Sequence, residues 1–542
     1  MTPFRPAVFV LIATATIAGA AELSVGPGKR FTKPSQAAAS AHNGDIVNID
    51  AGVYEGDVCV WTQKDLLIRS VGGLAHMKSG GKVANGKAIW VVAGVNITVE
   101  GIEFSGASCR DGNGAGIRIE GTAPTVRGCY FHDNQNGILT ANDPLNDVLI
   151  ERCEFASNGA GEGQTHNLYI NHIRSLTFRW NYSHHAKVGH NIKTRALANH
   201  IIGNRFMDEA TGTSSYVVDI PNGGLTFLLG NIIQQGPASS NRSVMINYGE
   251  EPNGRNPIQR LYVINNTCVN DHPQAGVFLN IAAGTTVARV ENNLFIGPGT
   301  PINGPATSKL RNLCASPSQL VNRAAYDYRL VPGASAIDAG IDPGTADGQA
   351  LLPIGQYVHP KDMETRMVVG AAPDIGAYEF GVTAKARRKK GGEAATQVAV
   401  DKPPEPKAEP KPPPQLADAK QKEVWIARLR GAVERELAAR REPQFELASL
   451  RAQATLRELP ADGVMVLALA GTGEMTVAWA TLTDRDRASL ATGMARRNDP
   501  QLNALAAFFL LAIGQESTAR DHLMRAGEQA AAVEAAFAPS AK

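Results

Sequence analysis

Two short strand-like strings recur along most of the chain, and this repetition limits the fold more than any other feature of the sequence. The first string ends in x-N-x-apolar or C-x-F, and its copies lie roughly 23 to 35 residues apart, as in TVRGCYF (125–131), LIERCEF (149–155), LTFRWNYS (176–183), HIIGNRF (200–206), TFLLGNII (226–233) and ARVENNLF (288–295). The second string falls between these copies and alternates polar and apolar residues, as in NLYIN (167–171), NIKTR (191–195) and VVDIP (217–221). Period-two alternation indicates β-strands, and two interleaved strand series predict a coil of parallel strands that adds one turn per repeat.

An asparagine returns at the same place in successive copies, at Asn181, Asn204, Asn231, Asn266 and Asn293. Stacked turns place equivalent side chains ~4.8 Å apart, so these amides are expected to hydrogen-bond along a ladder. The alternative is that they are ordinary exposed turn residues. The cysteines Cys129 and Cys153 also match in position; they are interpreted as a buried thiol pair, with a disulfide as the open alternative.

Motifs near the two ends of the repeat region carry a family resemblance. SQAAASAHNGDIVNIDAGVYEGDV (35–58) resembles the helix cap and first turn of right-handed parallel β-helix proteins of the pectate-lyase-like (pectin lyase fold) superfamily. YDYRLVPGASAIDAG (326–340) and PDIGAYEF (373–380) resemble the closing segment of secreted bacterial members. The resemblance implies an all-β right-handed parallel β-helix over residues 22–382, and it does not fix an activity.

The remainder of the chain differs in composition. Residues 383–420 are rich in Pro, Lys and Glu and are predicted to be a linker. Residues 421–542 are predicted to form a small, mainly α-helical domain with a tetratricopeptide-like helix pair, in which the first helix ends at Gly514 and the second begins near Glu516. The segment 463–483 fits either a β-hairpin or a helix. Nothing in this domain indicates catalysis, so we expect it to dock a protein partner.

The N-terminus indicates export. It has a single Arg5, an apolar stretch, and the small residues Ala18-Gly19-Ala20, which predicts a signal peptide over residues 1–21 and a periplasmic, cell-surface or extracellular protein. An N-terminal anchor is the alternative, but the apolar run is shorter than the ~20 residues of a spanning helix. With 53 Lys and Arg against 51 Asp and Glu, the net charge of +2 gives no reason to expect nucleic acid as a partner.

Alternate residues of a strand face opposite sides. If Leu168, Ile192 and Val218 point into the coil, an outward strip forms on successive turns of one sheet, made of Tyr169 and Asn171, Lys193 and Arg195, and Val217 and Asp219, with Arg118 and Glu120 before it and Asn247 and Asn280 after it. Histidines cluster beside this strip: five of the 12 fall within residues 166–190.

The strip suits an acidic polysaccharide. β-Elimination in a uronate polymer needs a group that neutralises the carboxylate, a base that removes the α-proton, and an acid that protonates the departing oxygen. We predict Lys193 as the base, Arg195 as the neutralising group, and His190, His166 or Tyr169 as the acid. Substrate is expected to be positioned by Asn171, Asp219, His184, His185 and Lys187. Some β-helix lyases use such Lys/Arg pairs, so the resemblance supports these classes of role.

Several alternatives stay open. A hydrolase needs two flanking carboxylates, and the strings typical of β-helix polygalacturonases are missing from the sequence. An epimerase shares the proton chemistry of a lyase, and a non-catalytic glycan-binding surface protein needs none of it. The charged residues could also form a surface salt-bridge ladder. A calcium cofactor is a further open alternative. Calcium requires several oxygen ligands, and the acidic pairs near the strip that could supply them are Asp208/Glu209 and Glu250/Glu251. No histidine or cysteine spacing predicts a closed zinc site.

Overall fold

A computed structural model describes residues 20–382, 419–447, 452–460, 463–469, 473–495, 499–513 and 515–537. The chain divides into two compact units, Met1–Glu393 and Ala394–Lys542. The predicted signal peptide and linker fall almost wholly outside the described residues. Among the helices that the structure describes, none is long and apolar enough to cross a membrane.

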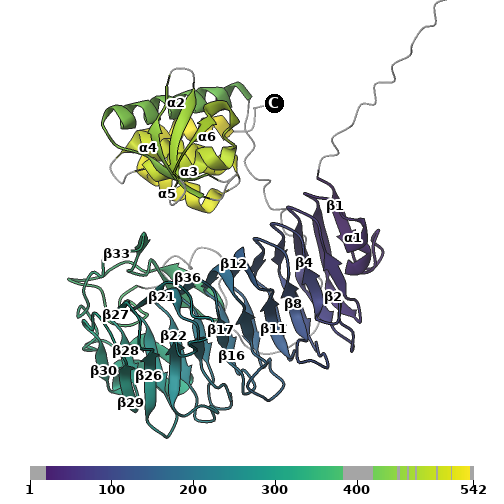
Figure 1. Ribbon diagram of the computed structural model, residues 1–542, viewed down its shortest axis with the longest axis vertical. Helices are drawn as coiled ribbons and strands as arrows, with labels where there is room; N and C mark the ends of the chain where they lie inside the picture. Colours follow the sequence, from purple (N-terminus) through teal and green to yellow (C-terminus); the bar gives the residue numbers. More distant parts are fainter. Residues whose placement is uncertain are drawn as a thin grey trace, which may run out of the picture. The chain divides into compact units, whose positions relative to one another are not determined.

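The first unit is a parallel β-solenoid, as the repeats predict (Figure 1). One of its sheets has ten strands, one from each turn: β3 (Cys59–Trp61), β5 (Ala88–Val92), β8 (Ala115–Ile119), β11 (Asn136–Thr140), β14 (Leu168–Ile170), β17 (Ile192–Thr194), β20 (Val218–Ile220), β23 (Val244–Tyr248), β26 (Gly276–Ile281) and β29 (Gly299–Asn303). We call this the ten-stranded sheet. The NLYIN and NIKTR strings supply β14 and β17.

The other faces of the solenoid come from a sheet in which two parallel ladders meet at the long strand β4 (Leu67–Lys78), which pairs with both β6 (Thr98–Glu100) and β7 (Ile102–Ser105). The ladder that continues from β4 through β7 is called the β7 ladder. Its further strands are β10 (Tyr130–His132), β13 (Glu154–Ala156), β16 (Tyr182–His184), β19 (Arg205–Met207), β22 (Ile232–Gln235), β25 (Thr267–Asn270), β28 (Leu294–Ile296) and β30 (Leu313–Ala315). The second ladder contains β1 (Glu22–Val25), β2 (Ile46–Glu55), β9 (Thr125–Arg127), β12 (Asp143–Glu151), β15 (Ile173–Arg179), β18 (Ala198–Ile202), β21 (Gly224–Leu229), β24 (Gln259–Ile264) and β27 (Val287–Glu291).

The core is filled by residues from the recurring strings. A row of five phenylalanine rings runs along the axis, with neighbouring ring centroids 4.9 to 5.9 Å apart over Phe104, Phe131, Phe155, Phe178 and Phe206. Each buried aromatic ring of this size contributes about 2–3 kcal/mol through the hydrophobic effect. Cys129 and Cys153 are fully buried free thiols, which agrees with the thiol interpretation of their matching positions.

The predicted asparagine ladder is confirmed. In each step the Nδ2 of one asparagine donates to the Oδ1 of the next, at 2.9 to 3.1 Å, through Asn181, Asn204, Asn231, Asn266, Asn293 and Asn312. The same Oδ1 also accepts the backbone N–H of the preceding asparagine. The amides therefore replace backbone partners where the chain turns between strands.

Both ends of the solenoid are covered by the segments that carry the family resemblance. At the N-terminal end lies α1 (Pro34–Ser40), which buries Pro34, Ala37 and Ala38 (Figure 1). The closing segment packs onto the outer face of the later strands of the β7 ladder, where Ile375 and Ala377 join a cluster with Tyr182 and Met207. The earlier turns of this ladder instead carry polar side chains on the same face.

The second unit combines helices with a small antiparallel sheet. Its elements are α2 (Ala419–Ala438), β37 (Gln444–Leu447), β38 (Ala452–Glu458), β39 (Val464–Leu469), β40 (Gly473–Ala478), α3 (Asp484–Met494), α4 (Pro500–Ala512), α5 (Glu516–Ala526) and α6 (Ala530–Phe537). The pairing of β39 with β40 decides the open question over residues 463–483 in favour of the hairpin. The helix pair is present as α4 and α5, whereas Gly514 lies outside the described residues.

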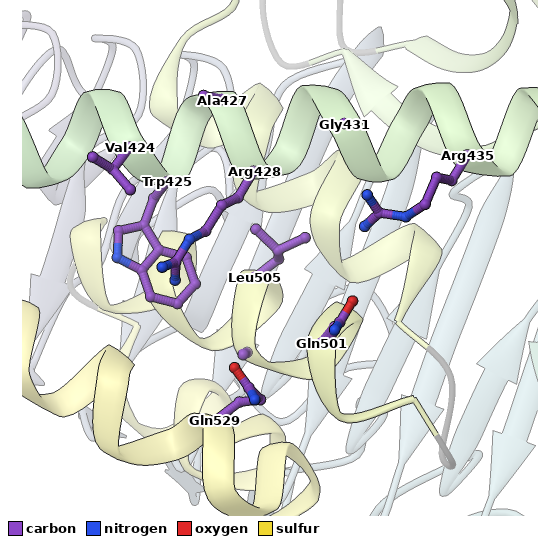
Figure 2. Close-up of a pocket in the computed structure, with 10 residues that line it drawn as sticks. Val424, Trp425, Ala427, Arg428, Gly431, Arg435, Gln501, Leu505 and Gln529 are labelled. Carbon is purple, nitrogen blue, oxygen red and sulfur yellow. The ribbon is translucent and has the colours of Figure 1, made fainter.

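A groove of about 630 Å³ lies between α2 and α4 in this unit (Figure 2). Trp425 and Leu505 form its apolar part, and Arg428 and Arg435 reach over it from α2. Trp425 stacks on Phe508 at 4.6 Å between ring centroids, which anchors α2 on α4. The groove could not be predicted from the sequence, because its residues come from segments about 70 to 100 residues apart.

Candidate active site

The outer surface of the ten-stranded sheet carries one residue per turn in register. Along the axis these residues are Val60, Val91, Arg118, Leu139, Tyr169, Lys193, Asp219, Asn247, Asn280 and Asn303. The strip therefore runs from apolar residues, interrupted by Arg118, through an aromatic ring, a cation and a carboxylate to a row of amides, which confirms the predicted register. The prediction that Val217 also faces outward is wrong: Val217 precedes β20 and is fully buried in the core.

Two cations and two carboxylates meet at the centre of this strip. The Nζ of Lys193 lies 3.3 Å from Oδ2 of Asp219 and 3.7 Å from Oε1 of Glu251. Nη1 of Arg195, just after β17, donates to Oε2 of Glu251 at 2.6 Å. Glu251 comes from the connection between β23 and β24, and its side chain is 46% exposed, whereas that of Asp219 is only 3% exposed. Glu251 is thus the replaceable partner of the two cations, and Asp219 is the fixed one.

Arg195 also organises the neighbouring turns. Its Nε donates to the hydroxyl oxygen of Tyr169 at 3.1 Å, and its guanidinium carbon lies 6.0 Å from the centre of the Tyr169 ring. Its Nη1 hydrogen-bonds to Oδ1 of Asn222 as well. Because the Tyr169 oxygen accepts from Arg195, its own proton is free to point toward a ligand above the sheet.

His190 is fixed by both of its ring nitrogens. Nδ1 accepts the backbone N–H of Tyr216 at 3.3 Å, so the ring proton sits on Nε2, which lies 3.4 Å from Oδ2 of Asp219. Burial alone would raise the pKa of Asp219, but the hydrogen bond from His190 and the positive charge of Lys193 outweigh it, and the pKa is lowered. Asn247 donates to the other oxygen of Asp219 at 2.8 Å. His190 and Asn247 thus hold the carboxylate that fixes Lys193.

His166 stacks on His190 one turn earlier, with ring centroids 4.6 Å apart. Its Nδ1 accepts the backbone N–H of His190 at 3.1 Å. Burial, reinforced by the positive charge of Lys193, holds the pKa of His166 well below its usual range, so its ring is neutral at pH 7. With Nδ1 occupied, the neutral ring carries its proton on Nε2 and acts as a hydrogen-bond donor.

Of the remaining predicted site residues, Asn171 lies beside the ten-stranded sheet, one turn before Arg195, and the others lie elsewhere. His184 belongs to β16 of the β7 ladder, and its Nδ1 is 2.7 Å from Nδ1 of His185. Lys187 pairs with Asp133 at 3.0 Å. Asn171 follows β14, and its side chain accepts the N–H of His172 at 2.9 Å. The histidine cluster of the sequence therefore divides in two, with His166 and His190 at the ten-stranded sheet and His184 and His185 on another face.

Glu251 and Asn222 complete the site but were not expected there. In the sequence, Glu250 and Glu251 stood out only as an acidic pair considered for calcium binding. In the structure Glu250 accepts from Asn280 at 2.7 Å, while the Arg195 hydrogen bond, aided by the charges of Lys193 and Arg195, lowers the pKa of Glu251. Asp208 of the other pair accepts from Ser214 and Asn191. These oxygens face protein donors, which is not the arrangement of an oxygen cage for calcium.

Comparison with known proteins adds no further assignment: no protein-family model matches the chain, and no curated protein matches it.

Proposed function

We propose that the protein is exported and cleaves a uronate-containing polysaccharide by β-elimination on the outer face of the ten-stranded sheet. Some of the β-helix lyases that the chain resembles use Lys/Arg pairs like Lys193 and Arg195, which supports the reaction class. The observation that carries the proposal is the position of Glu251. Its carboxylate contacts both Arg195 and Lys193 and is more exposed than either, and so marks where the carboxylate of a uronate residue would bind.

The contacts of the site suggest how the roles divide. A uronate displaces Glu251 and pairs with Arg195, which withdraws charge from the carboxylate and makes the adjacent C–H more acidic. Lys193, next to Arg195 and held by Asp219, is the base that removes this proton. Tyr169, whose oxygen accepts from Arg195, donates its proton to the glycosidic oxygen as the bond breaks. The products are a chain end with a C=C bond and a new free hydroxyl.

The two histidines are assigned supporting roles in this reaction. Both ring nitrogens of His190 have protein partners, so His190 is assigned as a positioning residue for Asp219 and Lys193 rather than as the proton donor. His166 remains a candidate to donate a hydrogen bond from Nε2 to the sugar.

The test is to incubate the purified full-length protein with alginate, pectate and glycosaminoglycans and to follow ultraviolet absorbance of the unsaturated product. Absorbance that grows with the protein and is lost in Lys193→Ala and Arg195→Ala supports the proposal. Lys187→Ala is the matched control, because it removes a lysine from a different face. New reducing ends without absorbance indicate hydrolysis, and changed uronate stereochemistry at constant chain length indicates an epimerase.

Glycan binding without cleavage is the second candidate. One observation favours it: Lys193 and Arg195 are both paired with carboxylates, as is expected of charged residues on a surface that only binds an acidic ligand. Retention on an immobilised acidic polysaccharide, lost in Arg195→Ala and with no chemical change in the polymer, would select this candidate.

A further inference from the structure

A second constellation of titratable residues lies on the outer face of the β7 ladder, on the early turns that the closing segment leaves uncovered. His76 of β4 is in register with Glu103 of β7, and His132 of β10 follows one turn later. Glu103 and Ser105 point to the same side of β7, and His132 is in register with Ser105. The side chains of His76, Glu103 and His132 are each about one-fifth exposed, so solvent reaches them.

Both histidines direct one ring nitrogen at the same oxygen atom. Oε1 of Glu103 lies 2.9 Å from Nε2 of His132 and 3.6 Å from Nδ1 of His76. One ligand atom from each of the three residues lies within 4.8 Å of the other two. Zn²⁺ binds histidine nitrogen and carboxylate oxygen at about 2.0–2.2 Å, so two of its ligand atoms lie about 3.0–3.6 Å apart. The distances in this cluster are close to that range.

The opposite nitrogen of each histidine already has a hydrogen-bonding partner. Nε2 of His76 is 2.7 Å from Oγ of Ser105, and Nδ1 of His132 is 2.9 Å from Oδ2 of Asp133. Asp133 is held in turn by Lys187 at 3.0 Å. Histidines that bind metals usually donate their second N–H to a carboxylate or another oxygen, which fixes the tautomer and turns the free lone pair toward the metal. Ser105 and Asp133 are the oxygen partners of this kind for His76 and His132.

The approach of His76 to Glu103 is better explained by a cation than by a hydrogen bond. A separation of 3.6 Å is too long for an N–H···O bond. When Nε2–H of His76 donates to Ser105, the Nδ1 lone pair faces the carboxylate oxygen of Glu103, and a positive ion between these two electron-rich atoms draws them together.

We propose that His76, Glu103 and His132 bind a divalent transition-metal ion of the Zn²⁺ type, with Ser105 and Asp133 orienting the two histidines. Three protein ligands on a solvent-facing surface leave a coordination position open for water or for an anionic ligand. This site is independent of the proposed elimination, because its residues belong to the β7 ladder and the Lys193 site belongs to the ten-stranded sheet.

The experiment titrates chelator-treated full-length protein with Zn²⁺ by calorimetry at pH 7, and with Co²⁺ while the visible spectrum is recorded. One ion is expected to bind, without the thiolate-to-cobalt absorption that cysteine ligands would give. Glu103→Gln and His132→Ala should each weaken binding at least about 100-fold, and Asp133→Asn about 10- to 100-fold, as for other outer partners of metal-bound histidines.

His184→Ala is the matched control, since it removes a histidine two turns along the same face and should leave the affinity unchanged. Circular dichroism of each variant checks that the solenoid is folded. The proposal is overturned if the wild-type protein binds no ion at micromolar concentration. It is equally overturned if Glu103→Gln, with its fold intact, binds as tightly as the wild type.

Discussion

The carboxylate of Glu251 accepts a 2.6 Å hydrogen bond from Arg195 and lies 3.7 Å from the ammonium of Lys193. A half-exposed side chain from a connecting segment thereby covers the two cations that the outward strip presents. Any acidic ligand that uses this pair must displace Glu251, so the protein's own carboxylate competes with the ligand.

Replacing Glu251 with glutamine should therefore tighten the binding of acidic polysaccharide. The neutral amide no longer neutralises Arg195 and Lys193, so both cations are available to the ligand. A partly exposed ion pair of this kind is worth ~1 kcal/mol or less, so the affinity is expected to increase by up to about fivefold. Binding of pectate and alginate by calorimetry measures the effect. Glu250→Gln is the control, since Glu250 accepts from Asn280 instead. Weaker binding by Glu251→Gln would mean that Glu251 contacts the ligand itself.

Tyr169→Phe should separate binding from chemistry. The ring stays near Arg195, but the hydroxyl that would protonate the leaving oxygen is removed, so turnover should fall about 10²- to 10⁴-fold while KM changes little. Initial rates of absorbance change on each polysaccharide provide the measurement. Tyr216→Phe is the control, because the ring of Tyr216 contacts His190 edge-on but its hydroxyl has no assigned role. This variant should keep most activity. An equal loss in both variants would remove Tyr169 from the role of acid.

The buried Asp208 should make stability depend on pH. Burial raises its pKa to about 6, against the hydrogen bonds from Ser214 and Gly236 that would lower it. The folded protein then keeps a proton that the unfolded chain, with a pKa near ~4, releases as the pH rises. The free energy of unfolding should therefore fall between about pH 4 and 6, by roughly 3 kcal/mol from this group, and level off above that range.

Asp208→Asn isolates this contribution, because the amide does not ionise. Denaturant unfolding of both proteins from pH 4 to 8 should show the wild type losing stability relative to the variant through the window and running parallel to it above pH 6. Asp362→Asn, at a half-exposed carboxylate, is the control. A constant difference across the whole pH range would show that Asp208 does not titrate there.

The solenoid could be predicted from the sequence because each turn repeats the same packing problem. Inward residues such as Ile192 and Val218 must fill one continuous core, so their spacing recurs in the amino-acid sequence. The register of Tyr169, Lys193 and Asp219 follows from this spacing. Connections between strands obey no such repeat. This is why Glu251, about 56 residues after Arg195 in the chain, could not be foreseen as its partner.

The separation of the clustered histidines into two groups also follows from the path of the chain between strands. His184 and His190 are six residues apart, yet the chain turns a corner between β16 and β17 and places them on different faces. Proximity in sequence was therefore a poor guide to which histidines share a site. His76 and His132 are 56 residues apart and meet at Glu103 because successive turns of the β7 ladder stack in register.

The asparagine ladder, which was predicted, offers the clearest test of what holds the turns together. The Oδ1 of Asn231 accepts from the backbone N–H and the Nδ2 of Asn204, and its own Nδ2 donates to Ile201 and Asn266. Asn231→Ala would leave several fully buried polar groups without partners, at about 1–3 kcal/mol each, so we expect a loss of roughly 3 kcal/mol or more in the free energy of unfolding. Asn253→Ala, at an exposed asparagine in a connection, should change it by less than about 0.5 kcal/mol. Denaturant unfolding of the two variants measures the difference, and equal stabilities would show that water or backbone shifts can replace the ladder.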